Sequence, residues 1–473
     1  MEEGVQAENS VDRALCAIFG SCDDWIRREL ETPAGVVCAY AIDGLVASSE
    51  IAEYLFRPLA EGSFSGSMGA AYRWALHGGL YNLSAEEIPD VPTAADRLTA
   101  GCCVLLFPGA GMLAFEAKSS TRRTPAPPEV ENTVKGAKDA FTETIRINTA
   151  LLRRHLRTPD LRLTAVTVGR RTKTNITVCS IAGLTDPSLP ERVLERLRGI
   201  DVDGLLSPAS VEEYLTGSRR TAFPLLQYTE RTDRFAQGLL DGRVGVLADG
   251  LPLGYLLPVD AGYLMTSPED AGMDYLSASV LRLLRWAALF VTLLLPGLYV
   301  AMATFQQEML PTALLRAITE SKRLVPFATA LEVLSMLLAF ELLQQAGIHL
   351  PQAVGQSVSI VGGLVVGTAA VDASLVSPAA LIVSAAAAIC GFVLPDRDFS
   401  NAVRLWRLLL TAAAACMGLF GLTVWAIALA TRLSVLRSLG VPYLGGARAV
   451  RPRLVTEKYR DPSLHPTDRR RQK

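Results

Sequence analysis

The stretch WAALFVTLLLPGLYVAMATF occupies residues 286–305 and carries no charged side chain over its 20 positions. A bilayer whose hydrocarbon core is about 30 Å thick is crossed by roughly 20 apolar residues in a helix. A second stretch, LLLTAAAACMGLFGLTVWAIALA at residues 408–430, is uncharged over 23 positions. Each stretch therefore predicts one membrane-spanning helix.

Three more apolar windows lie between these two. Residues 352–371 and 379–395 are uncharged, and we expect both to span, the shorter one with help from tilt or local thinning of the bilayer. The window at residues 324–343 contains Glu332 and Glu341, and a carboxylate at membrane depth is costly. We expect that window to lie at the interface or to re-enter, which leaves four full spans.

Both ends of the chain are expected in the cytoplasm. The first ten residues, MEEGVQAENS, lack the basic and apolar regions of a secretory signal. From residue 431 onward, 11 Lys or Arg stand against three acidic residues, and such an excess marks cytoplasmic segments. The number of crossings should therefore be even.

The region before the membrane helices reads as α/β. Residues 35–42 (GVVCAYAI) form a β-rich run before a turn and a helical pattern, and residues 101–107 and 112–117 flank a glycine turn as in a hairpin. The same order returns later in the chain. Gly101 aligns with Gly242 and Gly109 with Gly250, an offset of 141 in both cases. We expect two similar small α/β subdomains, thioredoxin-like or a related sandwich.

These patterns divide the chain into five segments. In order they are an α/β subdomain, a Pro-containing linker, a second α/β subdomain, a transmembrane helical domain and a basic cytoplasmic tail, at residues 1–120, 121–135, 136–270, 281–432 and 433–473.

Eight basic residues gather in the second subdomain against one acid, Asp160: Arg146, Arg153, Arg154, Arg157, Arg162, Arg170, Arg171 and Lys173. A face of this kind contacts anionic lipid or an acidic neighbour, or is simply a solvated helix and loop.

No catalytic, metal or cofactor site is expected. The four histidines show no HExxH spacing, the eight cysteines show no CxxC pair, and the Gly109–Gly111 turn does not extend to a phosphate-binding motif. The cysteines are expected to be reduced thiols, and no nucleic-acid partner is expected.

The membrane region contains two unusual sets of residues. Gly355, Ser359, Gly363 and Gly367 recur every four positions, so they share one helix face that favours close helix packing or lines a narrow pore. The acidic set is Glu332, Glu341 and Asp372. These three line a cation path or lie hydrated at the interface, and for Asp372 the interface is favoured.

Several long motifs carry a family likeness. FTETIRINTALLRRHLR, GRRTKTNITVCSIAGL, PLLQYTERTDRFAQGLLDGRVGVLADGLP and LPQAVGQSVSIVGGLVVGTAAVDASLVSPA follow one another in this order. Over residues 15–445 the chain resembles the A subunit of the spore germinant receptors, the GerA family of endospore-forming bacteria.

The resemblance implies a multi-pass protein of the spore inner membrane that acts with a transporter-like B subunit and a lipoprotein C subunit. It also implies a ring of A subunits around a cation-conducting pore that opens on nutrient binding. An A-like paralogue associated with the dipicolinate-release channel is the alternative within the family. A non-conducting scaffold and a secondary transporter are the alternatives outside it, and the membrane region shows no inverted repeat that would favour a transporter.

The motif matches also identify residues. In the membrane region the matched motif, residues 351–378, includes Gly362 with the small residues named above. The soluble region contains a further pair of matched motifs, which we interpret as assembly or coupling elements. Their residues are Arg170, Arg171, Lys173, Gln227, Tyr228, Glu230 and Arg231.

Overall fold

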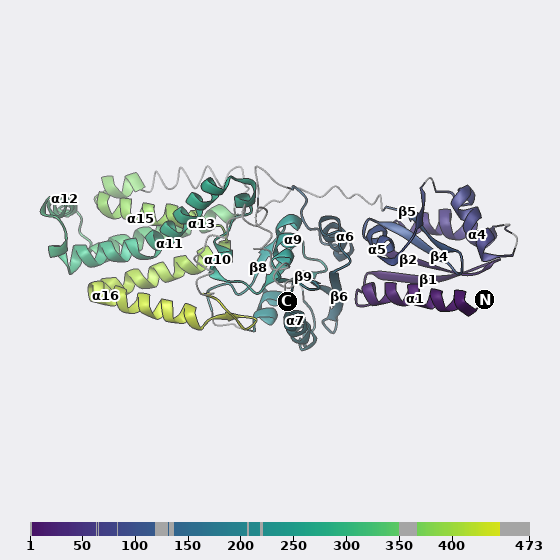
Figure 1. The fold of residues 1–473 in the computed structure, drawn as a ribbon. Coiled ribbons are helices and arrows are strands. Elements are labelled where there is room, and N and C mark those ends of the chain that lie inside the picture. Colours follow the sequence, from purple (N-terminus) through teal and green to yellow (C-terminus); the bar gives the residue numbers. More distant parts are fainter. Residues whose placement is uncertain are drawn as a thin grey trace. The chain divides into compact units, whose positions relative to one another are not determined.

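The computed structural model describes most of the chain, namely residues 2–62, 64, 66–82, 84–118, 131, 137–205, 208–217, 221–349 and 367–444. Internal contacts divide the chain into an α/β unit and a helical unit (Figure 1). The α/β unit contains residues 1–219 and 226–258, whereas residues 220–225 belong with the helical unit that begins at Val259. The expected linker at residues 121–135 lies outside the described residues, except for Glu131.

The first subdomain is a five-stranded sheet in the order β1-β2-β4-β5-β3, with every neighbouring pair antiparallel. Its strands are β1 (Trp25–Thr32), β2 (Gly35–Ile42), β3 (Ala85–Ile88), β4 (Cys102–Phe107) and β5 (Gly111–Glu116). One face packs on α1 (Glu2–Phe19) and α5 (Val91–Thr99). The other face packs on the continuous helical segments α2 (Ser48–Ile51), η1 (Ala52–Phe56) and α3 (Arg57–Glu61), and on α4 (Met68–Trp74).

The second subdomain repeats this arrangement. Its sheet has the order β6-β7-β9-β10-β8, which is the first order position for position, and its pairs are also antiparallel. The strands are β6 (Leu161–Val168), β7 (Thr174–Ile181), β8 (Gln227–Thr229), β9 (Val244–Ala248) and β10 (Gly254–Leu257). The helices are α6 (Ile145–His155), α7 (Ser188–Arg198), α8 (Pro208–Thr216) and α9 (Thr232–Leu240).

The duplication expected from the sequence is confirmed. Gly101 and Gly242 have φ of 89° and 84°, and Gly109 and Gly250 have φ of 69° and 82°. A positive φ of this kind is readily adopted only by glycine, so the aligned glycines make the same turns in both subdomains. The wholly antiparallel sheets place the subdomains among the related α/β sandwiches rather than with a thioredoxin-like sheet, which contains parallel strands.

The helical unit contains long apolar helices. They are α11 (Tyr275–Thr304), α13 (Thr329–His349), the shorter α15 (Pro378–Phe392) and α16 (Arg397–Val435). Of the described helices α11, the first 18 residues of α13, and α16 are long and apolar enough to cross a bilayer. Shorter elements join or precede them: α10 (Ala261–Leu264), η3 (Pro268–Gly272), η4 (Gln307–Met309) and α12 (Thr312–Lys322). Pro296 lies inside α11, which continues through it.

The helix α16 folds back on itself, which corrects the expectation of one straight span at residues 408–430. Gly418 has φ 61° and ψ −145°, outside the helical region. The rings of Trp406 and Trp425 lie 6.4 Å apart, whereas 19 residues of straight helix would separate them by about 28 Å. Residues 397–417 and 419–435 are thus two antiparallel legs (Figure 1).

The window with two carboxylates lies mostly in one continuous helix, α13, which packs against α11, α15 and α16. Val333, Met336 and Leu337 of this helix are buried in a core shared with α11 and α15. The helix is therefore an integral member of the bundle, and its expected position at the interface or as a re-entrant segment stays a prediction.

The C-terminal hairpin packs at one end of the helical unit and consists of β11 (Arg437–Ser438) and β12 (Val441–Pro442). Tyr443 is fully buried, and its backbone carbonyl accepts a hydrogen bond of 3.0 Å from the amide of Ala261. Phe223 contacts the rings of Phe399 and Tyr443. The two ends of α16 therefore lie at the same end of the bundle. Of the expected basic tail, residues 445–473 lie outside the described residues.

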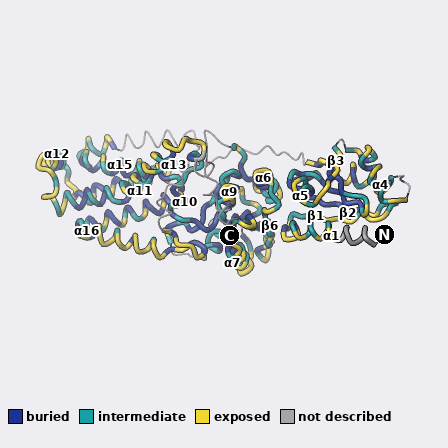
Figure 2. Tube along the Cα trace, viewed as in Figure 1, coloured by how far each residue is buried: buried dark blue, intermediate teal, exposed yellow. Residues whose placement is uncertain are grey.

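Burial differs between the two units. The sheets and the inward helix faces of the α/β unit are buried, whereas α13, α15 and α16 contain many exposed residues (Figure 2). Large apolar side chains are among the exposed ones. The exposed set includes Leu338, Ile382, Ile389, Leu405 and Ile427. Exposed apolar area on long helices is what a lipid environment favours, because lipid tails are as apolar as the side chains.

Candidate functional site

The carboxylate of Glu332 lies in the first turn of α13 and is fully buried. Its Oε1 lies 3.2 Å from Nζ of Lys322, and its Oε2 accepts a hydrogen bond of 2.9 Å from the backbone amide of Ser377. A buried carboxylate is tolerated when a cation and hydrogen bonds compensate its lost hydration. Glu332 therefore ties the start of α13 to the start of α15.

The carboxylate of Glu341 faces the first leg of α16. Its oxygens lie 3.0 Å from Arg404 and 3.5 Å from Arg407. Arg407 is 1% exposed, and its Nε and Nη1 have no hydrogen-bond partner among the described residues. Two guanidinium groups thus face one carboxylate, so this cluster is net positive rather than acidic.

Of the third predicted acid and the small-residue face, the structure describes Asp372 and Gly367. Asp372 is exposed, and its position at the interface stays a prediction. Gly355, Ser359, Gly362 and Gly363 lie outside the described residues. A Cβ added at Gly367 would lie 3.4 Å from the side chain of Leu381, an ordinary packing distance to α15.

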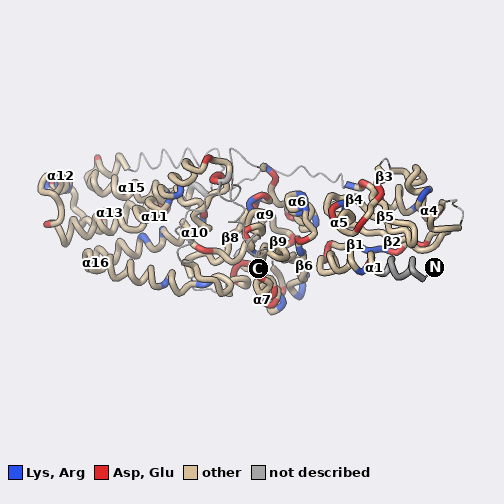
Figure 3. Tube along the Cα trace, viewed as in Figure 1, with Lys and Arg blue, Asp and Glu red and all other residues tan. Residues whose placement is uncertain are grey.

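A buried ion cluster that the sequence interpretation missed lies where α11 begins. Both carboxylate oxygens of Asp270 accept hydrogen bonds of 2.8 Å from Arg285, and Oδ2 accepts another from Arg282. Burial alone would raise the pKa of Asp270, but these hydrogen bonds lower it below its ordinary value. The sequence signal was available, since two arginines precede the uncharged stretch at residues 286–305 by four residues or fewer. Figure 3 shows how sparse charge is along α11 and α15 beyond this point.

The first predicted coupling motif is a tight turn between β6 and β7. Arg170 forms two hydrogen bonds of 2.5 and 2.6 Å with Asp201, and Arg171 lies 3.7 Å from Asp203. Lys173 has φ 45°, an uncommon value for a residue with a side chain. All three residues are exposed on the second subdomain.

The second predicted coupling motif lies at the edge strand β8. Gln227 is 1% exposed, and both polar atoms of its amide lack a partner among the described residues. The carboxylate of Glu230 accepts a hydrogen bond of 2.7 Å from the amide of Glu131, and Arg231 pairs with Asp233. Tyr228 is half-buried on the same strand. The structure does not bring the two motifs into one site, because the strand order β6-β7-β9-β10-β8 places the turn between β6 and β7 at one edge of the sheet and β8 at the other.

The basic residues of the second subdomain contact the first subdomain. Arg153 is 1% exposed and binds Asp24 through two hydrogen bonds of 2.5 and 2.8 Å. Arg162 donates to the carbonyl of Ile18, and Arg146 pairs with Asp43. Three of the eight basic residues therefore bind the first subdomain, an alternative absent from the sequence interpretation.

A histidine-carboxylate pair near this interface provides a pH-dependent prediction. Nε2 of His155 lies 2.7 Å from Oδ2 of Asp139; this hydrogen bond raises the pKa of His155 above its ordinary value and lowers the pKa of Asp139 to about 2. The His155 contribution is complete below its unfolded pKa of about 6.5 and is lost as pH rises through the higher folded value. The Asp139 contribution is lost as pH falls from about 4 toward 2.

We therefore expect the pair to stabilise the fold most between about pH 4 and pH 6.5. The measurement is the free energy of unfolding of wild type and Asp139→Asn across the pH range. A difference between the two proteins that grows steadily above pH 7 would contradict the assignment.

Comparison with known proteins identifies the family of this chain. Residues 13–462 match the sequence profile of the family described as "Bacillus/Clostridium GerA spore germination protein". The chain is 34% identical to the uncharacterized membrane protein YfkQ of Bacillus subtilis (strain 168), over 91% of this chain and 84% of that protein. It is 37% identical to spore germination protein KA of the same organism, over 70% of this chain and 61% of that protein.

A solved structure also matches, the crystal structure of the N-terminal domain of the A subunit of the Bacillus megaterium spore germinant receptor GerK3. It covers 52% of this chain and 91% of that chain at 25% identity, with a TM-score of 0.40. On the profile match through both units and the identities above 30%, this chain is a member of the GerA family of spore germination proteins.

Proposed function

We propose that the chain is the A subunit of a nutrient-responsive germination receptor in the spore inner membrane. It assembles in a ring with copies of itself, joins a transporter-like B subunit and a lipoprotein C subunit, and forms or gates a cation-conducting pore. The observation that carries the proposal is the family match, which runs through the α/β unit and the bundle alike.

The charges of the bundle refine which residues can line such a pore. Glu332 and Glu341 each have a cationic partner, so neither offers a free negative charge to a cation. The small-residue face that includes Gly363 and Gly367 remains the candidate for pore lining or for packing between subunits. A pore lined by small residues selects by width and backbone carbonyls rather than by an acidic ring.

The second candidate function is a membrane scaffold that organises the partner subunits without conducting ions. The pairing of both membrane carboxylates favours it, because paired charges fix helices against one another. The A-like paralogue of the dipicolinate-release channel stays the alternative within the family.

The proposal is tested in spores and in liposomes. Spores that lack the chain are expected to lose their response to at least one nutrient while responding to others. Liposomes that contain the chain with its B and C partners are expected to release K⁺ when that nutrient is added, and Gly363→Leu is expected to abolish the release. A normal nutrient response of the spores refutes the receptor role, whereas a lost response without K⁺ release supports the scaffold.

The folded-back helix α16 predicts membrane topology. With two legs, cysteines placed at Asn401 and Val435 should react with a membrane-impermeant reagent from the same side of the membrane. Cysteines at Gln306 and Met417 should react from the opposite side, since the side chain of Gln306 contacts the turn at Gly418. The eight native cysteines are replaced first. Labelling of Asn401 and Val435 from opposite sides would exclude the folded-back arrangement.

A further inference from the structure

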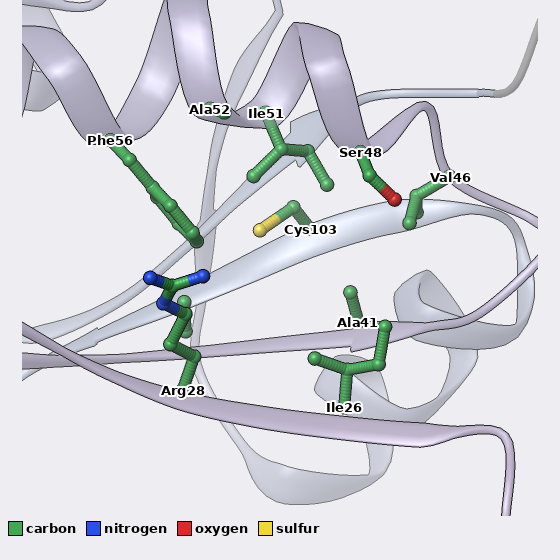
Figure 4. Close-up of a pocket in the computed structure, with 10 residues that line it drawn as sticks. Ile26, Arg28, Ala41, Val46, Ser48, Ile51, Ala52, Phe56 and Cys103 are labelled. Carbon is green, nitrogen blue, oxygen red and sulfur yellow. The ribbon is translucent and has the colours of Figure 1, made fainter.

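The first subdomain contains a hollow of about 190 Å³ between its sheet and the segment formed by α2 and η1. Its floor is buried and consists of Ala39, Ala41, Val46, Ile51 and Cys103. Its rim consists of Ile26, Arg28, Ser48, Ala52 and Phe56. Figure 4 shows Arg28 rising from β1 toward the ring of Phe56, with the thiol of Cys103 between the strands and the helix.

The hollow exists because small side chains face one another across it. Three alanines line it, Ala39 and Ala41 on β2 and Ala52, which is the first residue of the π-helical segment η1. Such wide turns inside helices are rare and often lie at functional sites.

The second subdomain shows that the fold does not require this hollow. Ala39 pairs with Leu105 in the first sheet, and Val178 pairs with Val246 in the second, where Leu105 and Val246 are related by the offset of 141. The same offset places Val244, which is fully buried, where the first subdomain has Cys103. Valine therefore occupies the positions of Ala39 and Cys103 in the second copy, as Val178 and Val244.

The rim of the hollow carries one cation. The guanidinium carbon of Arg28 lies 5.9 Å from the centre of the Phe56 ring. Arg28 has no acidic partner among the described residues, whereas its neighbour Arg27, on the opposite face of β1, binds Asp12 and Glu29. Successive residues of a strand point to opposite faces, so neither of those carboxylates lies on the side of Arg28.

These features determine which class of ligand the hollow can bind. A guanidinium recognises a carboxylate through two parallel hydrogen bonds, and the alanine, valine and isoleucine walls favour an apolar body. The volume lies below the range of about 300–1,000 Å³ for drug-sized ligands. Burial raises the pKa of Cys103 to about 12, so its thiol stays protonated and adds no second charge to the site.

We propose that this hollow binds a small organic carboxylate with an apolar body, held by Arg28 at the rim and by the buried floor of β2 and β4. The inference is independent of the receptor role proposed above, because it concerns binding by the α/β unit alone.

The test measures binding of 4-fluorobenzoate to the full-length chain in lipid nanodiscs by ¹⁹F NMR. Saturable binding is expected, with displacement by hexanoate and much weaker binding of the neutral isostere 4-fluorobenzamide. Arg28→Gln should weaken 4-fluorobenzoate about tenfold or more, since a hydrogen bond to a charged group contributes at least one decade in affinity. Ala39→Val, which introduces the side chain of the second copy, should also reduce binding by filling the hollow.

The matched control is Arg27→Gln, which removes the same charge from the same strand on its other face. Its affinity for 4-fluorobenzoate should equal that of the wild type. Arg28→Lys keeps the charge without the paired hydrogen bonds and should lie between wild type and Arg28→Gln. Absence of saturable binding, equal affinity for the amide and the carboxylate, or equal losses in Arg27→Gln and Arg28→Gln would each overturn the proposal.

Discussion

Asp24→Ala is expected to destabilise the α/β unit by about 3–5 kcal/mol, because it leaves the guanidinium of Arg153 buried without its counter-ion. The pair joins the two subdomains through hydrogen bonds of 2.5 and 2.8 Å, and the side chain of Asp24 is only 10% exposed. Burial would lower the pKa of Arg153, but the contact with Asp24 raises it above its ordinary value. In Asp24→Ala that contact is gone, but an arginine is not deprotonated in proteins, so the guanidinium cannot relieve its burial by losing a proton.

A nearby ion pair provides the control. Asp43 lies 2.6 Å from Arg146 between the same two subdomains, but the two side chains are 37% and 54% exposed. Exposed pairs contribute about 0–1 kcal/mol, so Asp43→Ala should change stability little. Urea unfolding of residues 1–258 measures both variants, and Asp24→Ala with Arg153→Met should recover much of the loss by removing the orphaned charge. Equal effects of Asp24→Ala and Asp43→Ala would contradict the assignment.

The loss of stability expected for Asp24→Ala is large compared with the stability of a single domain. Single domains are stable by about 5–15 kcal/mol, so this one contact carries a substantial fraction of that margin. It is reinforced by a backbone hydrogen bond of 2.9 Å from the amide of Asp23 to the carbonyl of Leu163. The two subdomains should therefore move as one body.

The soluble fold was largely predictable because its signals are local. Short apolar runs on either side of a glycine turn predict a hairpin wherever they occur, and the aligned pair Gly101 and Gly242 indicated that the unit occurs twice. The contact of Asp24 with Arg153 could not be predicted in this way, because 129 residues separate the two. Sequence spacing indicates which residues share a face but not which distant element covers it.

The acidic residues of the membrane region show the same limit. An isolated carboxylate in an apolar window predicts either a water-filled path or an interface. No local pattern indicated the arrangement that the structure has, in which each carboxylate is paired with a cation from another helix. Lys322 and Arg404 reach Glu332 and Glu341 only after the helices pack. For the small-residue face the prediction stays open, since most of it lies outside the described residues.

The hydropathy window did not predict the turn within α16, and the reason is different. A window average measures how much apolar chain is present but not its direction, and the residues on both sides of Gly418 are apolar. Length was the available signal, because 39 residues of straight helix would extend about 58 Å, nearly twice the hydrocarbon core. A helix of that length must leave the membrane or turn within it.

Gly418→Ala is accordingly expected to disrupt the bundle. The backbone of Gly418, at φ 61° and ψ −145°, lies close to a region that is essentially restricted to glycine, and strain there costs about 1–3 kcal/mol. An added Cβ would also lie 2.8 Å from the side-chain amide of Gln306 and 3.0 Å from Cβ of Phe305, so α11 would have to shift. Thermal unfolding of the full chain in detergent should show a lowered midpoint, and the yield of monodisperse protein should fall.

Gly391 provides the comparison that separates strain from the general cost of a methyl group in the bundle. A Cβ added there would lie 3.6 Å from the side chain of Thr292, which is ordinary van der Waals contact, and Gly391 lies within the regular helix α15. Gly391→Ala should therefore unfold near the wild-type midpoint or above it, because alanine favours a helix over glycine by about 1 kcal/mol. If Gly418→Ala behaved like Gly391→Ala, residue 418 would have to be helical, and the two legs of α16 would become a single straight helix.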